Sequence, residues 1–241
     1  KLSADDVVLS RLALISKDKP GGGTKHRLIW DLRRSGVNDA VSLGERVVLP
    51  RLSDALVDAL GVHQEAGGEV EFLAIDISDA FHNVPLHFSE RRYAAAKVGD
   101  TYVVFKVLAM GSKSAPGIWG RFAALLGRFV SSVCNPFHVR VEIYVDDPLL
   151  IAGGTHGDRT VGLAVGLFAL VALGFPLAWH KAAAGFEIGW IGASLSSSVD
   201  GVRISIPPDK VAALLADIKS FRSVSVVPVK KLKAFCGRLS F

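Results

Sequence analysis

The run EIYVDDPLLI, residues 142–151, places two adjacent aspartates between two apolar segments. Ile143 to Val145 precede the pair and Leu149 to Ile151 follow it. This pattern predicts two strands joined by a tight turn, because Asp is common in turns. Two interpretations are open at this point. The acids form an ordinary hairpin turn, or two rigid apolar strands hold them as a metal site.

The composition is that of a globular protein. Of 241 residues, 50% are hydrophobic and 21% are charged, which suffices for a large core and excludes a disordered chain. The net charge of +5 permits a polyanionic partner without requiring one. Cys134 and Cys236 lie far apart and lack metal-ligand spacing. We therefore expect both to be reduced core residues of an intracellular protein.

The two ends of the chain indicate whether it is a fragment, and one apolar segment indicates whether it spans a membrane. It begins with Lys and ends within a helical pattern, so we expect a fragment of a longer protein. Residues 161–179 are uncharged, and about 18 apolar residues is the usual threshold for a membrane span. Gly174 and Pro176 interrupt this run, which favours a buried helix and no membrane association.

The remaining pattern predicts an α+β protein with a mostly antiparallel sheet and a helical tail. Strands are expected on both sides of the glycine-rich turn near residue 22, in 70–75, in 101–111, in 186–195 and in 202–206. Helices are expected in 51–62 with Ser53 as N-cap, from 89 onward, in 114–133 with Pro116 in the first turn, in 207–221, and from 229. The helix in 207–221 is amphipathic, with Val211, Leu214, Leu215 and Ile218 on one stripe.

A second acidic site follows the apolar strand FLAI. Asp76 ends this strand and Asp79 stands three residues further on. Burial of a carboxylate without a partner or a metal is costly, although an N-cap Asp beside an exposed Asp remains the alternative. Carboxylates suit Mg²⁺, and two such ions ~3.5–4 Å apart can activate a hydroxyl and stabilise a leaving pyrophosphate. Two strand-borne acidic sites thus indicate phosphoryl or nucleotidyl transfer.

Five segments occur in the order of the reverse transcriptase motifs: DISDAFHNVPL, LAMGSKSAP, YVDD, LGFPLAWHK and WIGASL. From about Lys17 to its end the chain resembles the reverse transcriptase domain of a retrotransposon polyprotein. Among such elements it looks most like those of the tyrosine-recombinase type. The resemblance implies an α+β right-hand polymerase with fingers, an antiparallel-sheet palm and a helical thumb. The implied division is 1–70 for the N-terminal fingers, 71–195 for the palm with an inserted fingers segment at about 85–110, and 196–241 for the thumb and the start of the connection region.

The resemblance also implies an RNA-directed DNA polymerase, which extends a primer 3′ end with dNTPs on an RNA or DNA template. Asp76, Asp146 and Asp147 would form the catalytic triad, in which Asp76 and Asp146 are the direct metal ligands and Asp147 is the less direct partner. With the carbonyl of Ile77 they would hold two Mg²⁺ ions, with Mn²⁺ as an alternative. Lys181 matches the lysine proposed to protonate the departing pyrophosphate, and a simple salt bridge is the other interpretation.

The implied nucleotide-binding residues lie in the N-terminal half. Arg27 and Lys17 match the pair that grips the triphosphate, with Lys19 and Lys25 as competitors for the lysine role and a solvated basic hairpin as the alternative. The other implied contacts are the backbone N–H groups of Asp79 and Ala80, the ring of Phe81 beneath the sugar, and Met110. A ring at position 81 would collide with a 2′-hydroxyl, although Phe81 taken alone is more typical of a core aromatic.

The implied template and primer contacts are Gly111, Lys113, Tyr144, Trp190, Ile191 and Gly192. For Lys113 the alternative is an exposed lysine at a helix start. Lysines of the two C-terminal helices are further candidates for contacts to phosphate, or lie on a solvated face: Lys210, Lys219, Lys230, Lys231 and Lys233. The expected partners are an RNA and DNA template-primer and dNTPs.

Three residues depart from the family pattern: Ala109 where Pro is usual, Met110 where Gln or Phe is common, and Pro148 directly after the aspartates. They keep a second hypothesis open, a catalytically inactive, domesticated module that still binds nucleic acid. A third, an RNA-making polymerase, is opposed by Phe81, because such an enzyme must admit the 2′-hydroxyl.

Overall fold

The computed structural model describes residues 7–18 and 22–239. Within it the chain forms two compact units, residues 1–48 with 78–124 and residues 49–77 with 125–241. Lys19, one candidate for the triphosphate lysine, lies outside the described residues.

Two antiparallel ribbons form the sheets of the first unit. Its strands are β1 (Arg11–Asp18), β2 (Thr24–Asp31), β4 (Ala95–Val98) and β5 (Thr101–Val104). The expected pair around the glycine-rich turn is therefore confirmed as β1 and β2. Trp30 lies in the core of this unit with Leu32, Ala96 and Ala109, and its ring meets that of Phe105 edge-on at 4.7 Å.

The helix expected from residue 89 onward is wrong. Residues Phe88–Tyr93 form a 3₁₀ turn, and the alanines that follow belong to strand β4. Ala95 and Ala96 are fully buried and pair with β5. Tertiary pairing and burial therefore override the helical propensity of alanine at this place. The strand expected in 101–111 is shorter than predicted and ends at Val104.

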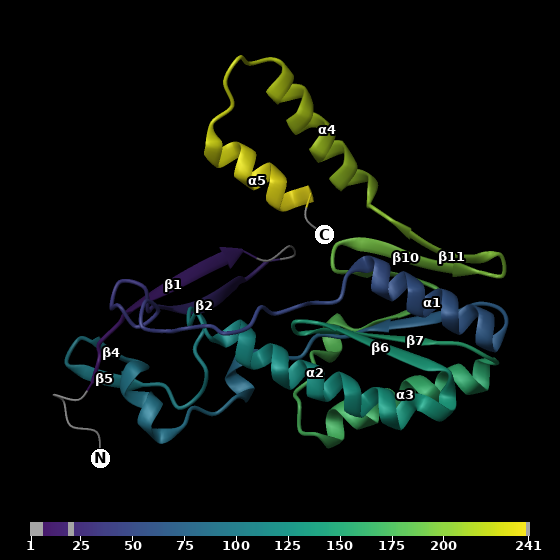
Figure 1. Cartoon of the computed structure of the whole chain (residues 1–241), viewed down its shortest axis with the longest axis horizontal. Coiled ribbons are helices and arrows are strands. Elements are labelled where there is room, and N and C mark those ends of the chain that lie inside the picture. Colours follow the sequence, from purple (N-terminus) through teal and green to yellow (C-terminus); the bar gives the residue numbers. More distant parts are fainter. Residues whose placement is uncertain (1–6, 19–21, 240–241) are drawn as a thin grey trace. The chain divides into compact units, whose positions relative to one another are not determined.

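A four-stranded antiparallel sheet organises the second unit. Its order is β6 (Val139–Tyr144), β7 (Asp147–Ala152), β3 (Glu71–Ala74) and β8 (Ala183–Gly185). Successive residues of β7 face opposite sides, as in any strand. Leu149 and Ile151 pack on α1 (Leu52–Ala66), whereas Leu150 faces α3 (His156–Ala172). Figure 1 shows α1 on one side of β6 and β7 and α3 on the other.

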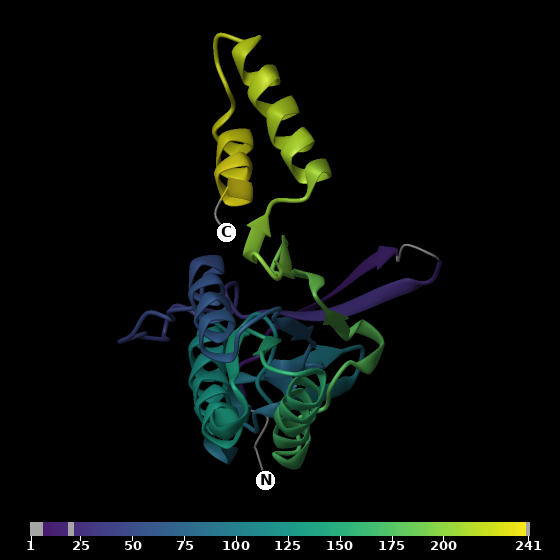
Figure 2. The ribbon, with the colours of Figure 1, turned by 90° about the vertical axis from the view of Figure 1, so that its right-hand side faces the viewer.

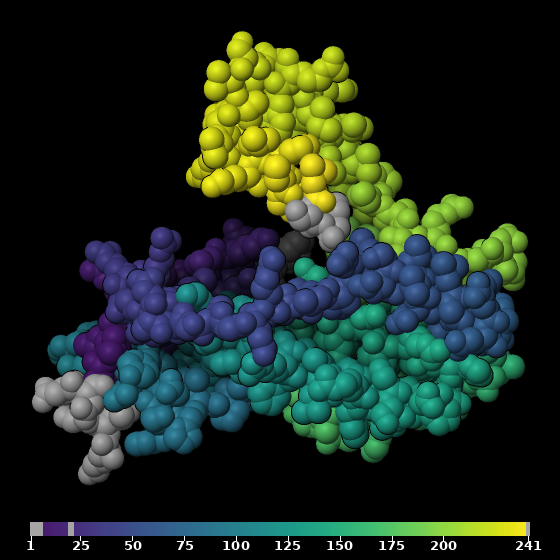
Figure 3. Space-filling model, viewed as in Figure 1, coloured from purple at the N-terminus to yellow at the C-terminus, as the bar shows by residue number. Residues whose placement is uncertain are grey.

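The remaining elements of the second unit are a three-stranded sheet and two helices. They are β9 (Glu187–Trp190), β10 (Ala193–Ser198), β11 (Gly201–Ser205), α4 (Pro208–Arg222) and α5 (Val229–Leu239). Helices α4 and α5 pack side by side through Phe221 and Phe235, whose rings meet edge-on at 5.2 Å (Figure 2). Their atoms are in contact in the space-filling view (Figure 3). Cys236 on α5 is exposed, so its expected core position is wrong, while Cys134 is buried.

Helix α2 (Ala115–Cys134) continues from the first unit into the second, with Pro116 in its first turn as expected. Helix α1 begins at Leu52, one residue before Ser53, so the prediction of Ser53 as its N-cap is wrong. Its cap is Arg51, whose N–H donates to the Asp54 carboxylate at 2.7 Å. Among the described residues, no helix has the length and apolar character needed to cross a membrane.

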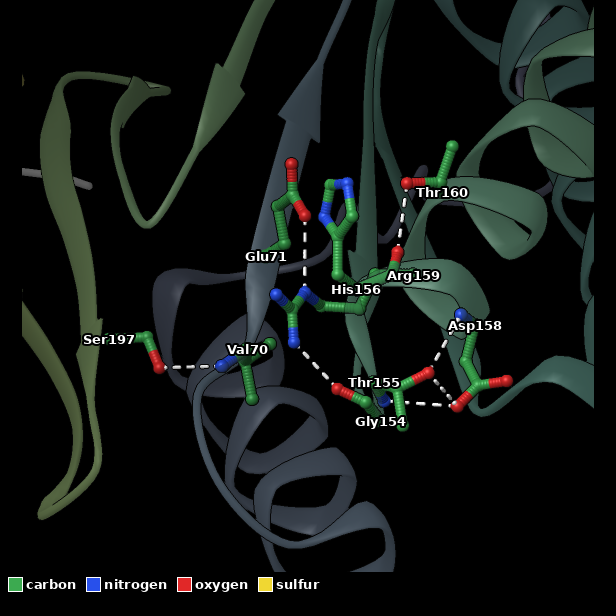
Figure 4. A network of polar contacts seen from close by, with 9 residues as sticks. All are labelled: Val70, Glu71, Gly154, Thr155, His156, Asp158, Arg159, Thr160 and Ser197. Atoms are coloured by element: carbon green, nitrogen blue, oxygen red, sulfur yellow. Dashed lines mark hydrogen bonds and ion pairs between the residues drawn. The ribbon is translucent and has the colours of Figure 1, made fainter.

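A polar network joins the start of β3 to the start of α3 (Figure 4). The guanidinium of Arg159 donates to the Glu71 carboxylate at 3.2 Å and to the Gly154 carbonyl at 2.6 Å. Thr155 caps α3 by accepting from the N–H of Asp158, whose carboxylate accepts from Thr155 in return. These contacts hold the first residue of β3, the strand that leads to Asp76, against α3.

Close packing between α3 and the sheet depends on a glycine. A methyl group at Gly166 would overlap the Leu150 side chain and approach Cys134 Sγ to 3.4 Å. We therefore expect Gly166→Ala to lower the free energy of unfolding by about 1–3 kcal/mol, measured by urea denaturation. Gly61→Ala in α1 is the matched control, because nothing lies within 4 Å of the added methyl, and it should stabilise by about 0.5–1 kcal/mol. Equal effects of the two substitutions would contradict this packing.

Candidate active site

Backbone pairing beyond the end of β3 brings the two acidic segments together. The N–H of Ile75 donates to the Pro148 carbonyl at 3.1 Å, and the N–H of Ile77 donates to the Asp146 carbonyl at 2.7 Å. Asp76 lies between these two bonds, directly across from Asp147. The residues predicted as a triad thus lie at one end of the sheet. The pair thus forms the expected tight turn, which sets its aspartates beside Asp76, and the metal site stays a prediction.

The turn itself is strained. Tyr144 pairs with Asp147, so the loop has only two residues, and Val145 adopts a left-handed φ of 55°. This conformation is unfavourable for a β-branched residue. The indole N–H of buried Trp190 donates to the Asp147 carbonyl at 3.1 Å, and the Tyr144 ring meets the Trp190 ring edge-on at 6.5 Å. The Trp190 indole therefore holds the backbone of Asp147 at the end of the acidic turn.

Pro148 fits this arrangement at the cost of one hydrogen bond. It is the second residue of β7 and is buried. Its carbonyl accepts from Ile75, but a proline has no N–H to return to the Ile75 carbonyl. Regular pairing of β3 ends at Ala74, one residue before this missing bond. The proline therefore shortens the ladder beside the site while the hairpin itself stays paired.

Lys181 reaches the carboxylates from a neighbouring turn. The Ala178 N–H donates to the Asp76 carbonyl at 2.8 Å, and the Lys181 N–H donates to the Ala178 carbonyl at 2.8 Å. The Lys181 ammonium then lies 2.6 Å from Asp76 Oδ2. The salt bridge considered for Lys181 is thus present, and it engages the first predicted metal ligand.

Three carboxylates in one place repel one another. Burial, with the charges of Asp146 and Asp76, raises the pKa of Asp147 to about 6, and the charge of Lys181 opposes this rise. Within the described part of the chain, no group of three His, Cys, Asp or Glu side chains is arranged to hold a metal ion as it stands. The donor set nevertheless fits a hard divalent cation, because clustered carboxylate oxygens are its preferred ligands and their repulsion is what a cation relieves.

A cavity of about 390 Å³ opens beside these residues in the second unit. It is lined by Asp76, Asp147, Lys181, the Ile191–Gly192 turn and Lys210. The turn joins β9 to β10, and Ile191 has a left-handed φ of 37°. Lys210 at the start of α4 donates to the Gly192 carbonyl at 2.8 Å. The sequence pattern did not predict the hydrogen bond from Lys210 to Gly192 or the one from the Trp190 indole to Asp147. Each of them joins segments that are distant in the sequence.

The first unit holds the residues predicted to bind nucleotide and template. Lys17 of β1 pairs with Lys25 of β2, and Arg27 lies two residues from Lys25. In an antiparallel pair these positions share one face. The ribbon therefore presents three exposed cations on one side. Two lysines placed directly across from each other repel, which makes this face a favourable place for an anion.

Gly111 and Lys113 have partners inside the first unit. Gly111 has a φ of 114°, and a methyl group there would overlap the Trp30 carbonyl. Its small size is thus required by the β2 backbone, a reason that differs from the expected approach of template. The Lys113 ammonium donates to the Val41 carbonyl at 2.8 Å. The carbonyl of Met110 accepts from the Trp30 N–H at 3.2 Å.

Asp79, Ala80 and Phe81 form the start of a 3₁₀ turn. Asp79 precedes the turn with a left-handed φ of 49°, and the turn runs from Ala80 to Asn83. The Asp79 carbonyl accepts from the His82 N–H at 2.7 Å. Ala80 is buried and Phe81 is half-buried. The chain therefore changes from strand to 3₁₀ turn within a few residues after Asp76.

The raised pKa of Asp147 predicts a pH-dependent stability difference. The folded chain binds this proton more tightly than the unfolded chain, so stability falls as the pH rises from about 4 to 6, and the full cost is present above 6. We expect Asp147→Asn to be more stable than the parent by about 1–2 kcal/mol at pH 7.5. The difference should vanish near pH 4. Urea unfolding of both proteins across this range is the measurement, and a pH-independent difference would contradict the prediction.

A family model and individual known proteins are similar to this chain. A family model described as "Reverse transcriptase (RNA-dependent DNA polymerase)" matches residues 19–195. The "Retrovirus-related Pol polyprotein from transposon opus" of Drosophila melanogaster is 22% identical over 230 residues, which is 93% of this chain and 20% of that protein. The chain thus spans a fifth of the length of this curated relative.

Solved structures with a similar fold come from foamy virus. The foamy viral protease-reverse transcriptase dRH in complex with double-stranded DNA has a TM-score of 0.65 at 18% identity, covering 94% of this chain and 35% of that one. The foamy viral protease-reverse transcriptase in complex with RNA/DNA hybrid has a TM-score of 0.63 at 17% identity, covering 94% of this chain and 27% of that one. The expected α+β right-hand polymerase fold is confirmed.

The similarity to a transposon polyprotein agrees with the retrotransposon source expected from the sequence, whereas the tyrosine-recombinase type stays a prediction. The matched family model covers most of the chain, including the segments that carry all three aspartates. The chain belongs to the reverse transcriptase family of RNA-dependent DNA polymerases.

Proposed function

We propose that this chain is a catalytically competent polymerase core, which extends a primer 3′ end with dNTPs on an RNA or DNA template by nucleotidyl transfer with two metal ions. The observation that carries the proposal is the pairing of the Ile75–Ile77 segment with Asp146 and Pro148, which sets Asp76 beside Asp147. Such fixed positioning matters because phosphoryl transfer depends chiefly on geometry and on charge stabilisation. In this proposal residues 1–70 and about 85–110 serve as fingers, 71–195 as palm and 196–241 as thumb.

Asp76, Asp146, Asp147 and the Ile77 carbonyl would hold Mg²⁺, or Mn²⁺ in its place. Bound there, the two ions would supply activation of the primer hydroxyl and stabilisation of the leaving pyrophosphate. The chain's own groups hold the ligands in position: Trp190 supports the Asp147 carbonyl, and the Ala178 N–H bonds to the Asp76 carbonyl. Lys181, beside Asp76, would donate a proton to the pyrophosphate.

The basic face of the β1–β2 ribbon would bind the triphosphate. Arg27 offers a planar fork for two phosphate oxygens, while Lys17 and Lys25 act as point charges. The repulsion between the two facing lysines favours an anion at this face. Backbone N–H groups of Asp79 and Ala80 would cradle the phosphates, with Phe81 beneath the sugar and Met110 near the base or sugar.

Primer and template would be bound by short turns. The Ile191–Gly192 turn, with Trp190 and Tyr144 behind it, is proposed to place the primer 3′ end. Gly111 and Lys113 are proposed to lie near the template. The foamy virus structures are complexes with double-stranded DNA and with RNA/DNA hybrid, which supports nucleic acid of these kinds as the partner here.

An inactive nucleic-acid-binding module is the second candidate, and Pro148 is the observation that favours it. Its missing N–H removes a ladder bond one residue from Asp147. The intact carboxylate cluster and its cationic neighbour Lys181 favour the active enzyme, since an inactive module has no use for three carboxylates that repel one another.

Primer extension on an RNA template with dNTPs and Mg²⁺ tests the proposal. We expect the parent to extend the primer and Asp147→Asn to lose at least about 10³-fold in rate, because a metal ligand is removed. Asp100→Asn, in the exposed β4–β5 turn, removes the same charge and should keep full activity. Binding of the primer-template without extension by the parent would establish the inactive module in its place.

Selection against ribonucleotides tests the role of Phe81. If its ring lies beneath the sugar, Phe81→Val should raise the efficiency of rNTP relative to dNTP incorporation by about ten- to a hundredfold. Phe88→Val, which alters an exposed ring in the same unit, is the control and should leave the ratio unchanged. The measurement is kcat/KM for one nucleotide of each kind. An unchanged ratio in Phe81→Val would assign Phe81 to the core.

A further inference from the structure

The contact between Asp76 and Lys181 is built by the backbone as well as by charge. Ile77 and Leu177 form an isolated antiparallel bridge, and the Ala178 N–H bonds to the Asp76 carbonyl. The turn from Ala178 to Lys181 is closed by a further hydrogen bond of 2.8 Å. The ammonium is therefore carried to Asp76 Oδ2 by a fixed turn, and 19% of the Asp76 side chain stays exposed against 43% of the lysine.

The charge of Lys181 acts on more than its partner. It opposes the rise in the pKa of Asp147 that burial, Asp146 and Asp76 produce. The other ammonium lining this cavity, Lys210, donates to the Gly192 carbonyl. The Lys181 ammonium thus offsets part of the repulsion among the three carboxylates, a task that a bound divalent ion would also perform.

We propose that Lys181 is an internal counter-ion, which Asp76 exchanges for a divalent cation, and that this exchange limits how tightly the protein binds the cation. The inference rests on the proposed metal site. An ammonium and a divalent ion compete for the same carboxylate oxygens and repel each other at this separation. Binding of the cation must therefore separate Lys181 from Asp76 or draw the two positive charges together, and either cost lowers the affinity.

The exchange would also link the pairing of Lys181 with Asp76 to a later contact of Lys181 with a phosphate. While Lys181 pairs with Asp76, its ammonium is engaged by a carboxylate. After the exchange the ammonium remains in the same cavity, which Asp147 and the Ile191–Gly192 turn also line, and becomes free to meet an anionic phosphate. The charge needed to neutralise a leaving pyrophosphate would then become available only once a cation is bound.

The test is a titration with Mn²⁺ in the absence of nucleotide and nucleic acid. Electron paramagnetic resonance measures the concentration of free Mn²⁺, and hence the amount bound. We expect Lys181→Met and Lys181→Gln to bind Mn²⁺ about three- to tenfold more tightly than the parent, where tenfold corresponds to about 1.4 kcal/mol. Lys181→Arg keeps the charge and should stay within about twofold of the parent. Arg222→Met, at the exposed last residue of α4, removes one positive charge elsewhere and should also change little.

Each outcome decides the matter. Unchanged or weaker Mn²⁺ binding in both neutral variants would overturn the inference, since it would mean that Lys181 orients Asp76 for the metal. The proposed metal site would survive that result. No Mn²⁺ binding by the parent, or equal binding by a protein carrying Asp76→Asn and Asp147→Asn, would overturn the metal site and the inference with it. Should Lys181→Met fail to fold, judged by circular dichroism, Lys181→Gln preserves the shape of the chain at this position and decides the test.

The same exchange predicts a thermal signature in the folded variants. Without the Lys181 ammonium the repulsion among the three carboxylates is larger, so Lys181→Gln should unfold at a lower temperature than the parent in the presence of a chelator. Mn²⁺ at the same saturating concentration should then raise the unfolding temperature of Lys181→Gln by more than it raises that of the parent, because stabilisation by a ligand increases with the logarithm of its affinity. An equal rise in both proteins would count against the exchange.

Discussion

The pairing of β7 with the residues that follow β3 is the constraint on which the candidate site depends. Two backbone hydrogen bonds, from Ile75 to Pro148 and from Ile77 to Asp146, fix Asp76 across from Asp147. The apolar faces of the sheet hold these strands, since Leu149 and Ile151 pack toward α1 and Leu150 toward α3. The burial that stabilises the sheet thus also sets the distance between its carboxylates.

Charge and backbone strain gather at the same end of this sheet. Burial and the charges of Asp146 and Asp76 raise the pKa of Asp147 to about 6, and Lys181 opposes part of this rise. The turns that carry Asp146 and Gly192 each place a β-branched residue at a positive φ, Val145 at 55° and Ile191 at 37°. Strain of this kind costs about 1–3 kcal/mol per residue and persists where the surrounding structure enforces it. Here the Trp190 indole and the Lys210 ammonium bind the two turns.

Local patterns predicted most of the strands and helices, and tertiary contacts explain the misses. The acidic hairpin, the basic ribbon and α2 follow from alternation, turn residues and a proline in a first turn. The alanines of β4 failed as a helix because burial and pairing with β5 outweigh propensity. Ser53 failed as a cap because Asp54, one turn inside the helix, binds the Arg51 N–H. At Gly111 the Trp30 carbonyl supplies a reason for glycine that the pattern did not reveal, while the expected approach of template or nucleotide stays a prediction.

The order and spacing of the acidic, basic and aromatic motifs identify the family, because these residue types and their local turns depend only on residues that are close together in the sequence. The partners of those residues are decided only in three dimensions. Lys181 meets Asp76 across 105 positions, and the Trp190 indole meets Asp147 across 43. No periodicity spans such separations, since they depend on which strands pair and in what register. The sequence therefore names the charged groups of the site, while the antiparallel register determines which of them neutralise one another.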